Sequence, residues 1–184
     1  MGVLFDYFAA PSDEAAVATI DRVGGPGARS APAPQPSPKP RGLFRRAKPA
    51  APPPAALNNS AEPVYDTVEL KGIDPVVMIS TLESILTGVP YDEIIGGPRA
   101  GHVLDDRNSG ERLVVALSDE IHEALAAADR ESIARVVPDW LATDEFQMTH
   151  GWSEADVARI VDDLSALARR AKNRSDKLYC WVCV

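Results

Sequence analysis

The sequence has few cysteines, few aromatic residues and no long hydrophobic run. Its two cysteines lie at the C-terminal end and provide no disulfide framework. No stretch approaches the roughly 18 consecutive apolar residues that cross a membrane as a helix. Residues 1–10 contain Asp6 and no basic residue, which is unlike a secretory signal. We therefore expect a cytoplasmic protein without a transmembrane segment.

The overall composition indicates a folded, acidic protein. Aromatic residues make up 6% of the chain and hydrophobic residues 45%, so the core must consist mainly of Val, Ile, Leu and Ala. The net charge of -8 argues against a protein that binds nucleic acid over its whole surface. The heavy use of Ala, Arg and Pro is typical of a high-GC bacterial genome.

Proline and positive charge are concentrated in residues 26–56. This segment contains ten of the sixteen prolines, six basic residues and no acidic residue, so the rest of the chain carries -14. Closely spaced prolines remove the backbone donors that helices and sheets need, which predicts an extended, disordered linker. The predicted divisions are residues 1–25 for a first strand and helix of the main domain, 26–60 for the linker, and 61–184 for the main α+β domain.

Hydrophobic periodicity and capping residues predict an α+β fold. Strands are expected at residues 3–8, 64–70, 102–104, 112–117 and 178–184. Helices are expected to begin at Ser12, Asp74, Ser118, Asp129 and Ser153. The first should end at Gly24, and the one from Asp129 should stop before Pro138. The prediction is a single domain with a small mixed sheet and about four to five helices, in which the first and last strands could pair.

Cys180 and Cys183 have the spacing of a CxxC motif. Redox or metal chemistry needs both sulfur atoms on one side, usually in a turn or at the start of a helix. The surrounding residues favour a strand, on which positions three apart point to opposite faces. Tyr179, Trp181 and Cys183 should then share one face, with Cys180 on the other. Two structural cysteines are favoured, and a thiol or metal protein that uses both is the alternative.

The histidines lie in three different segments without ligand spacing, and no cofactor motif or metal site is predicted. His122 is expected at the surface or at a helix cap. His150 precedes the longest predicted helix, close to Trp152 and Asp144. No nucleophile is evident near these three residues, so a catalytic site formed by them is an alternative rather than the favoured interpretation.

A basic segment within the predicted linker is the candidate partner-binding site. It contains Arg41, Leu43, Phe44, Arg45, Arg46 and Lys48. Such a segment could be a solvated tether or a docking motif for another protein. It could also contact an anionic lipid surface or nucleic acid, or fold back onto the acidic remainder of the chain.

Residues 74–88 read DPVVMISTLESILTG, an apolar helix that ends in Leu-Thr-Gly. A segment with a Ser118-Asp119-Glu120 start follows, and then a long helix and a final strand with Trp181. In this order of elements, residues 70–184 resemble the bacterial YfbM-like family of unknown function. The resemblance implies a small α+β fold and supplies no activity. Where that family often has Trp and His, this chain has Ile79, Ser80 and Glu83.

These observations favour a non-enzymatic interaction protein of the bacterial cytoplasm, of adaptor or immunity type, that binds another protein. The reasons are the absence of a credible catalytic set and the basic segment attached to an acidic body. The alternatives are an enzyme with a site near His150 and Trp152, and a thiol or metal protein that uses Cys180 and Cys183.

Overall fold

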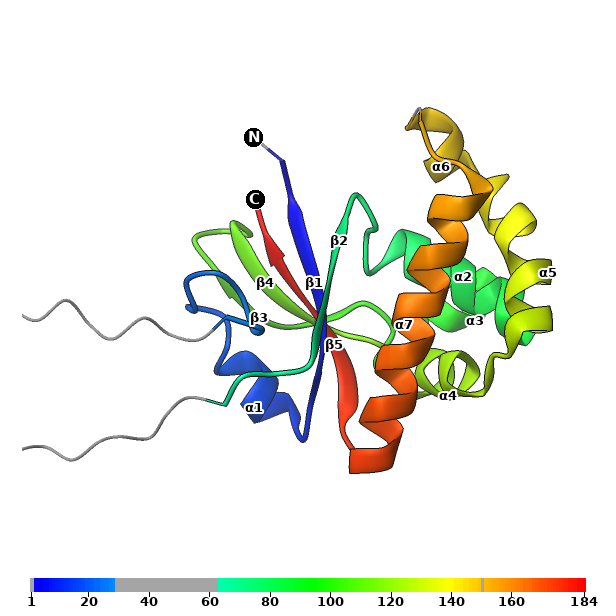
Figure 1. Ribbon diagram of the computed structural model, residues 1–184. Coiled ribbons are helices and arrows are strands. Elements are labelled where there is room, and N and C mark those ends of the chain that lie inside the picture. Colours follow the sequence, from blue (N-terminus) through cyan, green and yellow to red (C-terminus); the bar gives the residue numbers. More distant parts are fainter. Residues whose placement is uncertain (1, 29–62, 150) are drawn as a thin grey trace, which may run out of the picture.

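The computed structural model describes residues 2–28, 63–149 and 151–184, in which five strands form one sheet (Figure 1). The strand order is β2-β1-β5-β4-β3. The bounds are Leu4–Ala10 for β1, Thr67–Lys71 for β2, His102–Arg107 for β3, Arg112–Ala116 for β4 and Lys177–Cys183 for β5. The first and last strands of the chain pair at the centre of the sheet, as the sequence suggested.

Every strand pairing in the described residues is antiparallel, so the prediction of a mixed sheet was wrong in this detail. β3 and β4 form a hairpin. The helices between β4 and β5 return the chain to the end of the sheet at which β4 stops, where Ala116 pairs with Tyr179. A parallel neighbour would need a crossover to the opposite end. The α+β class and the single domain are as predicted.

The long helices cover one face of the sheet (Figure 1). They are α2 (Val77–Thr87), α4 (Asp119–Ala127), α5 (Arg130–Leu141) and α7 (Glu154–Arg174). Three five-residue helices raise the number in the described residues above the predicted four to five: α1 (Asp13–Val17), α3 (Tyr91–Ile95) and α6 (Asp144–Met148). None of the helices in this part of the chain has the length and apolarity to span a membrane.

Capping side chains start four of the five predicted helices where the sequence placed them, whereas α2, expected from Asp74, begins at Val77, and the Asp74 carboxylate accepts from the Val76 and Val77 N–H groups. Ser12, Ser118 and Asp129 each accept a hydrogen bond from a backbone N–H of the first turn. Ser153 and Asp156 form a reciprocal capping box at the start of α7. These bonds satisfy donors that have no partner within the helix, so local sequence fixes the helix starts.

The prediction that the helix from Asp129 stops before Pro138 was wrong. Helix α5 continues to Leu141. Proline lacks the N–H that would bond the preceding turn. The following turn is nevertheless held from both sides. The Ala142 N–H donates to the Pro138 carbonyl at 3.1 Å, and the buried Trp140 indole donates to the Met78 carbonyl at 3.1 Å. Tertiary packing therefore overrides the local breaker.

His122 also departs from its predicted surface position. It is buried where α4 packs on α7, and its Nε2 lies 3.0 Å from the Ala168 carbonyl oxygen. The residue joins two helices that are far apart in the sequence. Its role in the described structure is packing.

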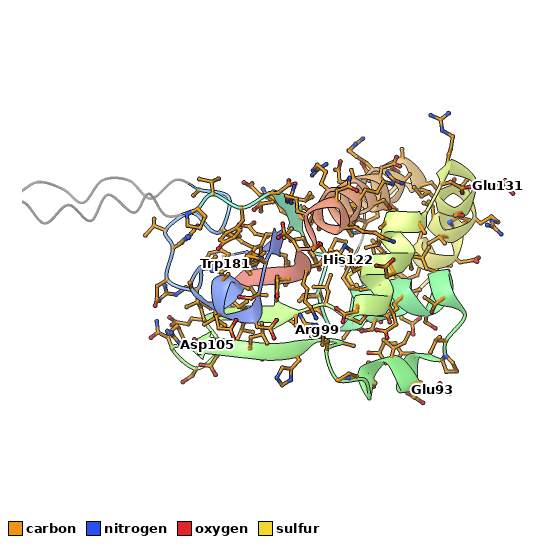
Figure 2. The ribbon with its side chains drawn as sticks, turned by 90° about the horizontal axis from the view of Figure 1, so that it is seen from below. Glu93, Arg99, Asp105, His122, Glu131 and Trp181 are labelled. Carbon is orange, nitrogen blue, oxygen red and sulfur yellow. The ribbon has the colours of Figure 1, made fainter. Side chains whose placement is uncertain are left out.

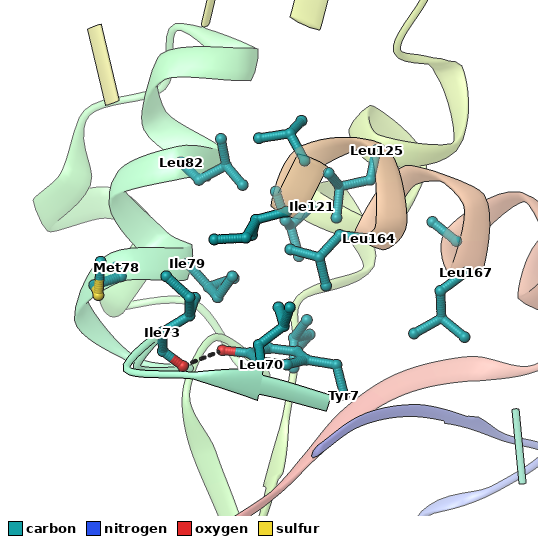
Figure 3. Packing of buried hydrophobic residues seen from close by; sticks show 14 of the residues in the cluster. Tyr7, Leu70, Ile73, Met78, Ile79, Leu82, Ile121, Leu125, Leu164 and Leu167 are labelled. Atoms are coloured by element: carbon teal, nitrogen blue, oxygen red, sulfur yellow. Dashed lines mark hydrogen bonds between the residues drawn. The ribbon is translucent and has the colours of Figure 1, made fainter. Parts of the chain in front are cut away.

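The two sides of the sheet have separate cores. On the helical side, Tyr7, Cys180 and Val182 pack with α2, α4 and α7 (Figure 3). On the other side, Phe8, Tyr179 and Trp181 pack with α1 and the turn after it. This division follows from the alternation of side chains along each strand.

Tyr7 joins the sheet to the segment before α2, and removal of its hydroxyl group should destabilise the fold. Its hydroxyl group is buried and donates to the Ile73 carbonyl at 2.8 Å (Figure 3). Tyr7→Phe keeps the ring and leaves that carbonyl without this donor, so the free energy of unfolding should fall by about 1–2 kcal/mol. Urea denaturation measures the change. Tyr65→Phe is the matched control, because its longer 3.4 Å bond to Ala15 is only partly buried; equal losses for both variants would contradict the assignment.

Candidate functional site

The sheet face opposite the long helices is only partly covered. Cross-strand register aligns Thr67, Phe8, Tyr179 and Ala116 in one row, and α1 covers that end. The next rows are Glu69–Asp6–Trp181–Val114 and Lys71–Leu4–Cys183–Arg112. No helix in the described structure covers these two rows, which leaves room for a pocket.

The turn after α1 forms one wall of this pocket. The first helix was expected to reach Gly24 but stops at Val17, and turns follow. Ile20 is buried against the sheet, whereas Val23 is 94% exposed. Gly24 and Gly25 have φ values of 86° and 79°, a left-handed conformation that favours glycine. The residues after Val17 therefore form a turn, not a helix, and this turn lies over the end of β1.

We call the resulting cavity of about 540 Å³ the Asp6 pocket. Its walls are mainly apolar, with charged groups at the floor and the rim. It is lined by Leu4, Phe5, Asp6, Arg22, Val23, Gly24, Glu69, Leu70, Lys71, Arg112, Trp181 and Cys183. A cavity of this volume with few polar groups is the usual form of a ligand site.

Asp6 is the unusual residue of the pocket. It lies in the centre of the sheet between Glu69 and Trp181 and is 8% exposed. Within the described residues its carboxylate makes no hydrogen bond and no ion pair. Burial, with the nearby Glu69 charge as a smaller cause, raises the pKa of Asp6 to about 6. A buried carboxylate without a partner is costly, and such groups are concentrated at functional sites.

Gly25 lies directly over this carboxylate. A Cβ atom at Gly25 would come within 2.1 Å of Asp6 Oδ2 and 3.6 Å of Trp181 Cε3. The indole N–H of Trp181 donates to the Ile20 carbonyl at 3.3 Å, which ties the turn to the sheet. Figure 2 shows Trp181 on the α1 side of the molecule. The turn can therefore approach Asp6 closely only because residue 25 has no side chain.

The two arginines that line the pocket are bonded to other groups, and Lys71, its third basic residue, forms no ion pair with Asp6 in the described residues. Arg22 donates to the carbonyl oxygens of Pro63 at 2.6 Å and Pro26 at 3.4 Å, and its guanidinium lies over the Tyr65 ring. Arg112 pairs with Asp21 at 3.0 Å. Neither forms an ion pair with Asp6 in the described structure, so the pocket holds cations at its edge and an unneutralised carboxylate at its floor.

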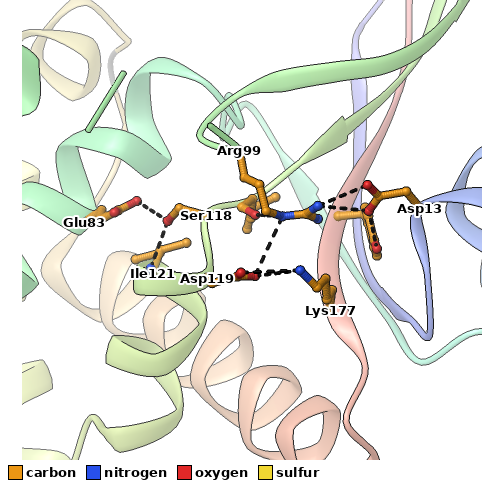
Figure 4. A network of polar contacts seen from close by, with 9 residues as sticks. Asp13, Glu83, Arg99, Ser118, Asp119, Ile121 and Lys177 are labelled. Carbon is orange, nitrogen blue, oxygen red and sulfur yellow. Dashed lines mark hydrogen bonds and ion pairs between the residues drawn. The ribbon is translucent and has the colours of Figure 1, made fainter. Parts of the chain in front are cut away.

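In a second polar cluster, the carboxylate has hydrogen-bond partners (Figure 4). Arg99 pairs with Asp13 at 3.0 Å, and the Tyr179 hydroxyl donates to the same carboxylate at 2.8 Å. The Arg99 and Tyr179 bonds hold the pKa of Asp13 below its usual value, against a desolvation effect that acts in the opposite direction. Figure 2 places Arg99 where the sheet meets the helical layer. This cluster joins α1 to β5 and is structural, because its carboxylate has partners.

Glu83 is likewise buried but satisfied. Burial raises the pKa of its carboxyl group, and the Ser118 hydroxyl donates to it at 2.6 Å (Figure 4). The adjacent cavity of about 280 Å³ is half the volume of the Asp6 pocket. Of the two buried carboxylates in the described residues, Glu83 has a hydrogen-bond partner and Asp6 has none.

Two of the residues predicted as sites, Trp152 and Asp144, are described by the structure and do not line the Asp6 pocket. Arg41, Leu43, Phe44, Arg45, Arg46 and Lys48 lie outside the described residues, as does His150. Trp152 packs edge-on against Phe146 at 5.5 Å between ring centroids, and it lines a groove of about 500 Å³ beside β2. Asp144 is exposed at the start of α6 and does not line that groove. The structure therefore does not bring Trp152 and Asp144 into one site.

The cysteines occupy opposite faces of β5, as the strand pattern predicted. Cys180 is buried among the helix-side residues, and Cys183 is half-buried at the rim of the Asp6 pocket. Both are free, and the described residues hold no cluster of three or more metal-ligating side chains. This geometry disfavours the alternative of a CxxC redox or metal pair.

Comparisons with protein-family models, with curated proteins and with solved structures found no match to this chain. The resemblance to the YfbM-like family stays a prediction. The candidate site consequently rests on the geometry of the Asp6 pocket alone.

The two thiols should differ sharply in reactivity. Burial raises the pKa of the Cys180 thiol well above its ordinary value, which suppresses the reactive thiolate. An aromatic disulfide reagent should modify Cys183 in the native protein and Cys180 only after unfolding. Stopped-flow thiol counting measures this, with Cys183→Ser as the variant that loses the fast phase. Two equally fast thiols would show that the strand geometry is wrong.

Asp6→Asn should stabilise the protein in a pH-dependent manner. The wild-type carboxyl group has a pKa of about 6 in the fold and an ordinary value of 3.8, so its ionised form is penalised only in the folded state. That penalty should develop as the pH rises from about 4 to 6 and should reach about 3 kcal/mol above pH 6. The charged or titratable groups lining the pocket around it are Arg22, Glu69, Lys71, Arg112 and Cys183.

The measurement is the difference in unfolding free energy between variant and wild type across that pH range. Shared contributions from other carboxyl groups cancel in this difference. Asp162→Asn, which removes an exposed carboxylate from α7, is the matched control. A stability difference that does not vary with pH would refute the raised pKa of Asp6.

Proposed function

We propose that this chain is a non-enzymatic interaction protein of the bacterial cytoplasm, of adaptor or immunity type, that receives a partner protein at the Asp6 pocket. The observation that carries the proposal is the buried carboxylate without a partner at the floor of an open, mainly apolar cavity. A protein retains such a group at a cost in stability. A partner that neutralises the carboxylate would recover that cost.

The composition of the pocket supports binding over catalysis. Its lining contains one thiol and no Ser, Thr, Tyr or His. A nucleophile activated by a neighbouring base requires a hydrogen-bonded pair, and Asp6 forms no such pair in the described residues. Asp6 has a pKa suited to proton transfer, but in the described residues no hydrogen bond joins it to the other titratable groups of the pocket, which are Arg22, Glu69, Lys71, Arg112 and Cys183.

The rim of the pocket is suited to contact with a protein. Leu4 is 47% exposed and Val23 94% exposed, and both line the cavity. Exposed apolar side chains around a recess with a polar anchor are the usual composition of an interaction site. The partner would bury these residues as it enters the recess.

The predicted basic segment is a second proposed contact. The chain leaves the described fold after residue 28 and returns at Pro63, and the two ends lie together because Tyr65 N–H donates to the Pro26 carbonyl at 3.1 Å. Arg22, which lines the pocket, bonds to Pro63. The segment that contains residues 41–48 therefore starts and ends in the chain next to residues of the pocket side, and we propose that it engages the same protein partner or an anionic surface near it.

Val23→Arg should weaken partner binding without disturbing the fold. The side chain is exposed, so a long charged group at this position would obstruct the recess and leave the core unchanged. Quantitative affinity capture from cells of the source organism, followed by calorimetry with the purified partner, should show binding weakened about tenfold or more.

Val103→Arg is the matched control, since Val103 is an exposed residue of β3 that does not line the pocket. Its binding should equal that of the wild type. A partner of the pocket should bind both the wild type and Val103→Arg more strongly than it binds Val23→Arg. If no protein shows this pattern, the Asp6 pocket is not an interaction site.

A further inference from the structure

We propose that the Asp6 pocket takes a cationic side chain of the partner, a lysine or arginine whose charged end meets the Asp6 carboxylate and whose alkyl stem lies along the apolar walls. This inference rests on the proposed function and specifies the chemistry of the same site. It depends on three observations: the burial of Asp6, the nature of the walls, and the distribution of charge around the pocket.

The floor of the pocket requires a positive group. Asp6 is 8% exposed and lines the cavity, with no hydrogen bond or ion pair in the described part of the chain. An anionic ligand would be repelled by it, and a neutral apolar ligand would bury the charge further without compensation. An ammonium or guanidinium group would supply the donors and the opposite charge together.

The walls suit a long alkyl stem. Leu4, Val23 and the ring of Trp181 supply apolar surface on this face of the sheet, and Trp181 lies beside Asp6 on the neighbouring strand. Lysine and arginine bury their methylene groups along apolar surface while the charged end reaches a polar partner. The ring of Trp181 would add favourable contact with a cation.

The charge nearest to Asp6 favours the same ligand. Glu69, opposite Asp6 on β2, adds a second negative charge that acts on it. Of the three basic residues that line the pocket, Arg22 and Arg112 are bonded to other groups, and Lys71 lies one row further along the strands, opposite Leu4. Outside residues 26–56 the chain carries -14, which attracts a basic partner over long range. Because the pKa of Asp6 is about 6, the carboxylate is ionised at neutral pH and protonated in mild acid.

The test is an NMR titration of the full chain with n-butylammonium and n-butylguanidinium chloride. Butyrate and n-butanol serve as anionic and neutral probes with the same stem. The indole N–H of Trp181 reports on the pocket, because it bonds to the turn over Asp6. The cations should shift this signal with millimolar affinity, and they should slow modification of Cys183. Butyrate and butanol should bind at least about tenfold more weakly.

Asp6→Asn should weaken cation binding about tenfold or more, and Asp162→Asn should leave it unchanged. Wild-type binding should also decrease as the pH falls through about 6, which tests the proposal independently of any variant. Equal binding of the four probes, stronger binding of butyrate, or an unchanged affinity in Asp6→Asn would overturn it. A shift of the signals of residues 41–48 caused by Asp6→Asn would also overturn it, because this chain's own basic segment would then be the occupant.

The two proposals can fail separately. If a partner is lost with Val23→Arg but neither cation binds, the interaction site stands and the ligand chemistry proposed here is wrong. If the cations bind at Asp6 but no partner depends on Val23, the ligand chemistry stands and the pocket serves a small cation instead of a protein.

Discussion

The pairing of the first strand with the last is the interaction on which the rest of the structure depends. Seven residue pairs, from Leu4 with Cys183 to Ala10 with Lys177, join β1 to β5 at the centre of the sheet. Within the sheet of the described residues, β2 pairs with β1 alone, and the β3–β4 hairpin joins the other strands through β5. The same pairing places Asp6 beside Trp181 and Leu4 beside Cys183. The pocket is therefore a product of the contact that closes the fold, and no loop can form it alone.

A central strand also explains why Asp6 lacks a partner. Both neighbouring strands occupy the backbone of β1, so the side chain has only the open face in front of it. On that face, Gly25 contributes no side chain, and Arg22 and Arg112 are bonded elsewhere. Asp13 and Glu83 are held by Arg99 and Ser118. Asp6 therefore differs from Glu83, the other buried carboxylate of the described residues, and a structure that leaves such a group unpaired accepts a cost in stability at that site.

The sequence was sufficient for features that depend on local pattern. The capping residues Ser118 and Ser153 mark real helix starts, and the alternation along residues 178–183 correctly separates Cys180 from Cys183. Tertiary contacts decided the rest. Pro138 lies within a helix because Trp140 is anchored to Met78. The antiparallel order depends on where the helical layer returns the chain. The pocket depends on cross-strand register, although a lone Asp within the apolar sequence Val-Leu-Phe-Asp-Tyr-Phe was a signal for it.

The Gly24–Gly25 pair lies between the Asp6 pocket and the start of the basic segment. In sequence it marks the end of a helix, but in the structure the helix has already ended at Val17 and the glycines shape the turn over Asp6. The turn is held by Trp181 on one side and leads to Pro26 and the tethered segment on the other. A side chain at residue 25 would come within 2.1 Å of the carboxylate, so either the Asp6 side chain or the turn would have to shift. The positive segment of 26–56 thus begins directly after Gly25, the residue that lies over the Asp6 carboxylate.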